Sequence, residues 1–260
     1  MSPEAKTGPA WRIAEEIRAQ IKRGEYQPGD RLPSRNELIE RHGISYKTAG
    51  KAIAHLVNAG LVTTRYGSGA YVRGDHEVRV VGPHRYSRAK WAVTTTEAHQ
   101  DETGQGEPIT RQGGQTQEVR REPADELTAA KLGVEPGAEV VVRDRVMTSD
   151  GQRTHTMTSY YRPEDVAGTP IEDQRPGIAG GGGGFAVFTE RGLEPRQMTE
   201  RIFARMPTAE EMNKLGLPPG EPVVELHRTT RTEAGQVIEF ARGVHSASRF
   251  AWEYTFDIPD

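Results

Sequence analysis

The chain has 260 residues, enough for two domains of ordinary size that each bury their own core. Hydrophobic residues make up 34% and charged residues 27%, as in globular proteins, and no apolar run reaches the length of a membrane span. The lack of cysteine excludes disulfides, thiolate nucleophiles and cysteine-ligated zinc. No secretion signal is recognisable, so we expect a cytoplasmic protein without membrane contact.

The charge is unevenly distributed along the chain. The formal net charge is −3, yet residues 1–75 hold twelve Lys or Arg against eight Asp or Glu, and residues 76–260 hold 22 against 29. A basic N-terminal part joined to an acidic remainder suits a module whose cations contact phosphate, followed by a domain that need not touch nucleic acid.

Apolar residues recur at helical spacing in three N-terminal segments, at about 11–23, 35–42 and 46–59. Ser34 and Glu37 match a capping box for the second helix, and Ser45 is a suitable N-cap for the third. The second and third helices are joined by a short turn that contains Gly43. This order predicts a helix-turn-helix, whose second helix enters the major groove of DNA through its N-terminal residues.

Two short β-prone runs follow, at 61–65 and 70–73, separated by a tight turn with two glycines at 66–69. They predict a β-hairpin wing. Small residues at its tip permit close approach to the minor groove, and Arg65 and Arg73 are expected to offer phosphate contacts.

The order of these motifs resembles the GntR family of bacterial regulators, over about residues 11–73. The matching runs are GEYQPGDRLPS at 24–34, GIS at 43–45, AIAHL at 52–56, GLV at 60–62 and GSGAYV at 67–72. The resemblance implies a winged helix-turn-helix domain that binds double-stranded DNA.

Several positions depart from the family pattern. Arg35 and Asn36 stand where Glu-Arg is usual, and Tyr46 and Gly50 stand where the recognition helix commonly carries arginine. The usual base-reading set therefore does not carry over, and we expect an unusual operator sequence. For the lysines, a solvated helix face remains an alternative. The DNA-binding candidates are Arg35, Asn36, Ser45, Tyr46, Lys47, Thr48, Lys51, Arg65, Gly67, Ser68 and Gly69.

The C-terminal part begins after an expected linker at 76–84. Residues 99–117 are rich in Gly, Gln, Glu and Thr and are expected to be mobile. The five glycines at 180–184 lack the Lys-Ser or Lys-Thr that a phosphate-binding P-loop requires, so they indicate a loop rather than a nucleotide site.

An internal repeat is more informative. The run KLGVEPG at 131–137 recurs as KLGLPPG at 214–220, and each copy follows a helical stretch and precedes two β-prone runs. One helix plus a hairpin, duplicated, predicts an α+β domain with a central antiparallel sheet.

This pattern resembles the UTRA effector domain of the HutC branch of GntR regulators, a fold similar to chorismate lyase, over about residues 80–258. The resemblance implies that a domain at 85–260 binds a small, often anionic effector and dimerises. The candidate effector-binding residues are Arg143, Arg145, Glu239, Arg242, His245 and Arg249. Alternating arginines that form only the exposed face of a strand are the alternative. The family's Arg-Gly-Asp-Arg segment is replaced by SASR at 246–249, which puts the usual ligand in doubt.

These observations predict a homodimeric repressor that binds a palindromic operator and is released by a small, polar or anionic effector. A ligand-independent autorepressor, as in regulators of plasmid transfer, remains open. An enzyme of chorismate-lyase type is disfavoured because we find no grouping of nucleophile, base and oxyanion donors, and the eight histidines lack metal-ligand spacing. No catalytic residue, metal site or cofactor is expected.

Overall fold

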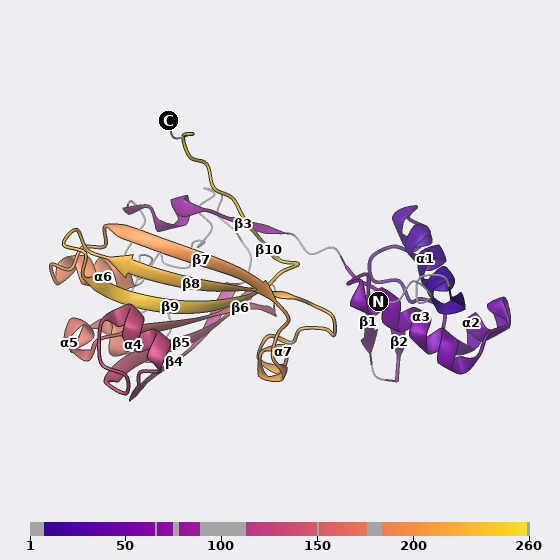
Figure 1. Cartoon of the computed structure of the whole chain (residues 1–260), viewed down its shortest axis with the longest axis horizontal. Coiled ribbons are helices and arrows are strands. Elements are labelled where there is room, and N and C mark those ends of the chain that lie inside the picture. The colour runs from indigo at the N-terminus through magenta and orange to yellow at the C-terminus, as the bar shows by residue number, and fades with distance from the viewer. Residues whose placement is uncertain are drawn as a thin grey trace. The chain divides into compact units, whose positions relative to one another are not determined.

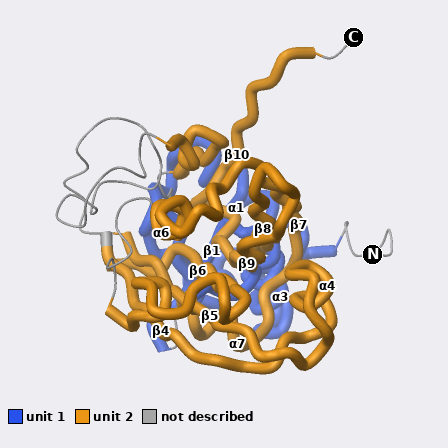
Figure 2. The backbone as a smooth tube through the Cα atoms, turned by 90° about the vertical axis from the view of Figure 1, so that its left-hand side faces the viewer, with its two compact units in different colours: residues 1–77, 217–221 blue, residues 78–216, 222–260 orange. Residues whose placement is uncertain are grey.

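The computed structural model describes residues 8–65, 67–74, 78–88, 113–149, 151–175 and 184–258. They fall into two compact units (Figure 2), one of residues 1–77 with 217–221 and one of residues 78–216 with 222–260. Part of the expected linker at 76–77, the polar stretch at 99–112 and the glycines at 180–183 lie outside the described residues.

The first unit contains the expected three helices and hairpin (Figure 1). They are α1 (Pro9–Lys22), α2 (Arg35–His42), α3 (Tyr46–Asn58), and the antiparallel strands β1 (Val62–Arg65) and β2 (Gly69–Val72). The capping box of α2 is present, since the Glu37 amide donates to Ser34 Oγ at 3.2 Å and the Ser34 amide donates to a Glu37 carboxylate oxygen at 2.6 Å. Gly43 ends α2 in the left-handed conformation with φ 62°.

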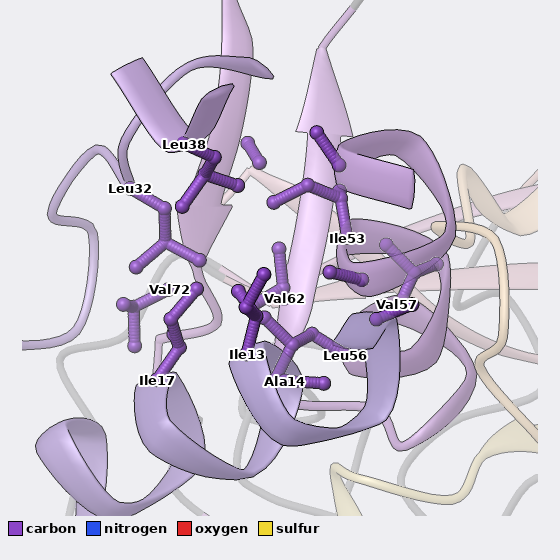
Figure 3. Packing of buried hydrophobic residues seen from close by; sticks show 14 residues of the cluster. Ile13, Ala14, Ile17, Leu32, Leu38, Ile53, Leu56, Val57, Val62 and Val72 are labelled. Atoms are coloured by element: carbon purple, nitrogen blue, oxygen red, sulfur yellow. The ribbon is translucent and has the colours of Figure 1, made fainter. Parts of the chain in front are cut away.

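Apolar side chains from all three helices and both strands form one core in this unit (Figure 3). Ile13 and Ile17 of α1 point between α3 and the hairpin, where Leu56 and Val62 lie. The buried members are Ala10, Ile13, Ala14, Ile17, Leu32, Leu38, Ala49, Ala52, Ile53, Leu56, Val57, Val62, Ala70 and Val72. Their burial packs α3 and the wing into one shared core.

The second unit is built on a six-stranded antiparallel sheet with strand order β4-β5-β6-β9-β8-β7, as expected from the sequence (Figure 1). Its strands are β4 (Gly113–Pro123), β5 (Glu139–Ser149), β6 (Gln152–Tyr161), β7 (Gln197–Arg205), β8 (Val223–Arg231) and β9 (Val237–Ser246). Its helical segments are η2 (Pro83–Tyr86), α4 (Glu126–Leu132), α5 (Pro163–Val166), η4 (Pro170–Glu172), α6 (Gly184–Glu190) and α7 (Ala209–Leu215).

The repeat in the sequence corresponds to a structural duplication. Each copy runs strand, helix, strand, strand: β4-α4-β5-β6 and then β7-α7-β8-β9, and the two copies meet where β6 pairs with β9. Gly133 and Gly216 occupy matching places, because each ends its helix in the left-handed conformation. The duplication therefore includes a strand before each helix that the sequence pattern did not reveal.

Two segments differ from what the sequence predicted. Residues 113–117, expected to be mobile, form the start of edge strand β4, so that expectation was wrong. β3 (Arg79–Val81) lies within the segment expected as linker and pairs in parallel with β10 (Phe250–Trp252).

The two faces of the sheet carry different side chains, because successive residues of a strand point to opposite faces. We call one the arginine face, which bears Arg143 and Arg145 of β5 and packs against α5, η4 and α6 around Val141. We call the other the α4 face, on which Val140 and Val142 pack against α4.

Candidate DNA-binding surface and effector site

The start of α3 presents polar side chains together with the start of α2. Arg35 donates to the Tyr46 hydroxyl at 3.0 Å, and its guanidinium carbon lies 5.1 Å from the centre of the Tyr46 ring. A Cβ at Gly50 would lie 3.6 Å from Arg35 Nε, an ordinary contact distance, so Arg35 passes directly beside Gly50. Tyr46 and Gly50, which replace the family's arginines, thus seat an arginine that comes from α2 instead.

Of the other DNA-binding candidates on these helices, one caps α3 and most of the rest are exposed to solvent. Ser45 Oγ accepts from the Thr48 amide at 3.2 Å and caps α3. Asn36, Lys47 and Lys51 are exposed, and Thr48 is half-buried. The exposed amide and ammonium groups form the polar surface of the helix pair.

The wing tip is shaped by glycine. Gly67 and Gly69 adopt φ values of 71° and 121°, which L side chains rarely adopt, so the tip stays narrow. Ser68 Oγ lies 2.5 Å from the Tyr71 hydroxyl, which braces the turn. The Arg65 side chain lies outside the described residues.

Two arginines near the wing revise the expected phosphate contacts. Arg73, expected to contact phosphate, forms an ion pair with Glu221 of the same compact unit, and its side chain is only 16% exposed. Arg31 is exposed and places its Nε 3.2 Å from where a Gly69 Cβ would lie. No periodic pattern in the sequence pointed to Arg31, because it precedes α2 and is brought to the wing by a bridge to Tyr71.

The arginine face of the sheet, together with η2, carries a cluster of buried and half-buried charges. We call it the cation cluster: Arg85, Arg143, Arg145, Arg228, Glu200 and Glu239. Strand register brings its members together, because Arg143 lies opposite Ser159, Ala241 lies opposite both Ser159 and Arg228, and Glu200 lies opposite Arg228. Four guanidinium groups face two carboxylates, which leaves a formal excess of two positive charges.

Glu239 is the central acceptor of the cation cluster. Its side chain is buried and accepts from the Tyr161 hydroxyl at 3.1 Å, from Arg228 at 2.9 and 3.2 Å, and from the Thr230 hydroxyl at 3.2 Å. Burial acts to raise its pKa, but Arg228 and then Arg145 outweigh burial, so the pKa lies below its usual value. Glu239 therefore stays ionised.

Arg143 and Arg145 are only partly satisfied within the cluster. Arg143 Nε donates to Gln117 at 2.8 Å, and Arg145 donates to the Ser159 hydroxyl at 2.9 Å. Among the described residues, buried Arg143 Nη1 and Arg145 Nε have no hydrogen-bond partner. Burial, followed by the nearby Arg145 charge, lowers the pKa of Arg143 to about 10, and the Glu239 charge only partly opposes this shift, so the side chain remains charged at neutral pH.

One wall of the cluster comes from η2 and α6. Tyr86 donates to Glu200 at 2.5 Å, and the Arg228 guanidinium lies 5.4 Å from the rings of both Tyr86 and Phe185. Burial raises the pKa of Tyr86, which keeps its hydroxyl protonated as a donor. Arg85 pairs with Glu200, and its buried Nη1 has no partner among the described residues.

The structure does not bring Arg242 to this cluster. Arg242 lies on the α4 face, where it donates to both Asp125 oxygens at 2.7 Å and to the Thr128 hydroxyl at 2.8 Å. Its guanidinium also lies 5.2 Å from the Tyr160 ring. The effector candidates Arg143, Arg145 and Glu239 therefore do not share a face with Arg242, since positions 239 and 242 of β9 point to opposite faces.

The two remaining effector candidates lie elsewhere. His245 is buried and stacks on His155 with ring centres 4.7 Å apart, against Phe250 of β10. Arg249 lies in the turn before β10, where its amide donates to the Ser246 carbonyl and its carbonyl accepts from Arg79. Through these contacts, His245 and Arg249 join the end of β9 to β10 and β3.

Arg228 and Tyr86 were missed by the sequence reasoning. A signal for Arg228 was present, since the repeat copies are 83 residues apart and this offset carries Arg145 to position 228. No comparable signal exists for Tyr86, which the fold brings from outside the repeat.

Other kinds of site find little support in the described part of the chain. No group of three or more His, Asp or Glu side chains there could hold a metal ion. Within the same residues, no helix combines the length and the apolar character that crossing a membrane requires.

Comparison with known proteins agrees with this architecture. Residues 9–72 match the model for bacterial regulatory proteins of the gntR family, and residues 113–251 match the UTRA domain. An uncharacterised HTH-type transcriptional regulator of Streptomyces coelicolor is 46% identical over 100% of this chain and 96% of its own length. The repressor NagR of Bacillus subtilis is 25% identical over 95% of this chain and 94% of its own.

Solved structures show the same fold. A crystal structure of a GntR-family transcriptional regulator superposes with a TM-score of 0.68 at 27% identity, covering 98% of this chain and 99% of its own. PhnF of Mycobacterium smegmatis gives a TM-score of 0.54 at 22% identity, covering 95% and 100%. The relatives are transcription regulators rather than enzymes, which removes the chorismate-lyase alternative. The chain thus belongs to the GntR family of transcription regulators with a C-terminal UTRA domain, and it is a DNA-binding regulator of transcription.

Proposed function

We propose that this regulator is a cytoplasmic homodimeric repressor that binds a palindromic operator through α3 and the wing. The exposed side chains of Asn36, Lys47 and Lys51 support base and phosphate contacts at the start of the helix pair. Two-fold symmetry of the protein would match the palindrome, with half-sites one helical turn or a multiple apart. Arg35, held against Tyr46, is the base-reading arginine of this proposal.

We further propose that a small anionic molecule binds the cation cluster and releases the protein from its operator. The observation that carries this proposal is that Arg143, Arg145 and Arg85 each have a buried guanidinium nitrogen without a hydrogen-bond partner among the described residues. A buried guanidinium nitrogen without a partner is costly, and a carboxylate or phosphate would satisfy it with charge-assisted hydrogen bonds. The partners of Glu239 are all internal, so we assign Glu239 to holding Arg228 rather than to the ligand.

The test is a thermal-shift screen of the full-length protein against phosphorylated and carboxylated metabolites, followed by calorimetry on any hit. A ligand that binds only the native state raises the melting temperature. Arg145→Gln should lose most of the shift, because this half-buried arginine donates only to Ser159 among the described residues, and its Nε has no partner there. Arg242→Gln is the matched control, since it removes the same charge from the other face of the sheet.

The outcomes separate the two regulatory models. A ligand that binds wild type and Arg242→Gln but not Arg145→Gln, and that lowers operator affinity by roughly five- to 150-fold, supports the inducible repressor. Operator binding with no response across the whole screen favours the ligand-independent autorepressor. Equal ligand binding by Arg145→Gln and wild type overturns the cation cluster as the site.

A further inference from the structure

The segment that follows β10 continues the side-chain pattern of a strand, but residues 254–258 pair with no strand of the described part of the chain. Phe250, Trp252, Tyr254, Phe256 and Ile258 alternate with small or polar residues, as along a strand with one apolar face. Within the described residues, the last backbone hydrogen bond of this run is that of the Glu253 amide to Val81. Exposure then rises from 43% at Tyr254 to 76% at Phe256 and 90% at Ile258. Figures 1 and 2 both show the segment leaving the sheet.

A second segment that lacks a pairing partner on one side is the edge strand β7. Among the described strands it pairs with β8 alone, so its other edge is open. Ile202 and Phe203 are 41% and 46% exposed, and Met206 just beyond the strand is 59% exposed. Open edges with apolar side chains are sites of strand addition.

From these two features we propose that two copies of this chain exchange residues 253–258, each segment adding as an antiparallel strand to the open edge of the other copy's β7. The inference rests on the homodimer of the proposed function and names the surface that forms it. Such an exchange is two-fold symmetric and closes on itself. It therefore yields a dimer rather than an open-ended assembly of many copies.

Charge and apolar pattern select one register. With Phe256 opposite the partner's Ile202, Asp257 falls opposite the partner's Arg201. Glu253 falls opposite the partner's Arg205, which already pairs with Glu211 and Glu225 of its own chain, so the charge match comes from Asp257 and Arg201. Arg201 is exposed and forms no ion pair with a described residue. A shift by two residues would place Phe256 opposite the partner's Glu200 and leave Asp257 opposite the partner's Thr199. Cross-strand pairs of opposite charge and of apolar residues favour the first register.

The segment does not reach this register on its own chain. The Tyr254 hydroxyl donates to Glu200 of the same chain at 2.8 Å, whereas the register places Ile258 at that residue. Four residues of extended chain span about 13 Å, so the segment would have to slide by that length to pair with its own β7. Tyr254 instead leads the segment past the edge of its own sheet, where a second copy would lie.

Cross-linking tests the exchange without background, because the chain contains no cysteine. We mix a tagged Phe256→Cys chain with an untagged Ile202→Cys chain, allow subunits to exchange, and add a short bis-maleimide. The proposal expects a covalent heterodimer of the two chains. Leu127→Cys on α4, 39% exposed, replaces Ile202→Cys as the control and should give none.

A charge swap tests the register by analytical ultracentrifugation. Arg201→Asp and Asp257→Arg should each raise the dimer dissociation constant about tenfold or more, since each places like charges opposite one another. The double variant should return to within about threefold of wild type, an outcome that general misfolding does not produce.

The results distinguish this inference from the proposed function. A wild-type protein that is monomeric while bound to operator overturns both. A dimer that gives no Phe256→Cys to Ile202→Cys product and ignores the charge changes overturns only the exchange and leaves the repressor dimer on another surface. A cross-link that forms within a single chain carrying both cysteines, with no heterodimer in the mixture, overturns the exchange in favour of pairing with the chain's own β7.

Discussion

Removing the Glu239 carboxylate should destabilise the C-terminal unit more than most single changes elsewhere in the sheet. Glu239→Ala leaves the Arg228 guanidinium, whose side chain is 10% exposed, without its counter-charge, and removes the acceptor of the Tyr161 and Thr230 hydroxyls. Breaking a buried ion pair by removal of one partner costs about 3–5 kcal/mol, because the remaining charge stays desolvated.

Urea unfolding measures this cost. With an m-value of about 2 kcal/mol/M, the loss corresponds to a fall of roughly 1.5–2.5 M in the midpoint. The chain has three tryptophans, and Trp252 of β10 reports on the C-terminal unit once Trp11 and Trp91 are replaced by phenylalanine. Fluorescence of Trp252 in that background then follows the unit that contains Glu239.

A double replacement checks the physical reason. Arg228→Met with Glu239→Leu removes both charges and keeps the volume, so it should recover about half or more of the stability that Glu239→Ala loses. A loss below about 1 kcal/mol for Glu239→Ala, or a double variant that is less stable than Glu239→Ala, would contradict the view that ion pairing within the cluster dominates this site.

Three further predictions concern the ends of helices and the DNA-binding surface. Ser34→Ala should lower the stability of the N-terminal unit by about 1 kcal/mol in thermal unfolding, because it removes the side-chain acceptor of the α2 capping box, whereas Ser34→Thr, which keeps a hydroxyl acceptor, should not. Gly50→Ala should stabilise α3 by up to about 1 kcal/mol without displacing Arg35, since the added Cβ lies at an ordinary 3.6 Å; weaker operator binding, measured by fluorescence anisotropy, would show that DNA approaches the helix at Gly50. Burial acts to raise the pKa of Asp125, but hydrogen bonds from Arg242 and the Thr128 amide outweigh burial and lower this pKa to about 2. The ionised Asp125 therefore stabilises the fold fully above the pKa of the unfolded chain, near 4, and this contribution is lost as pH falls through about 2. Because Asp125 is 55% exposed, the stability difference between wild type and Asp125→Asn should stay under about 1 kcal/mol at pH 6 and shrink towards pH 2; an unchanged difference would refute the pairing.

The N-terminal unit could be predicted closely because each of its elements carries a local signal. Ser34 and Gly43 bound α2 by capping chemistry, and the apolar period of α3 is undisturbed. The edge strands β4 and β7 carried no such signal, since edge strands bury little and their sequences are mostly polar. Their pairing is decided by the sheet beside them.

The proposed effector site could be predicted from the sequence only in part. Arg143 and Arg145 could be found because they alternate on one strand, and the cation cluster adds Arg228 by the symmetry of the repeat. Arg242 was placed with them from the motif alone. Successive residues of β9 point to opposite faces of the sheet, so a shift of one position changes the face of a side chain. Which residues share a face with Arg143 depends on the register of β9 against β6, and no local sequence pattern indicates this register.

Protection mapping of DNA upstream of the protein's own gene tests most directly the claim that α3 and the wing read an operator. We expect wild type to protect two symmetric half-sites with an affinity that falls as salt rises. Lys47→Ala with Lys51→Ala should lose the protection and flatten the salt dependence, whereas Lys22→Ala with Lys131→Ala, which removes equal charge from α1 and α4, should keep both. Protection by the Lys47 and Lys51 double variant equal to wild type, with its fold intact, would contradict the assignment of α3 to the DNA.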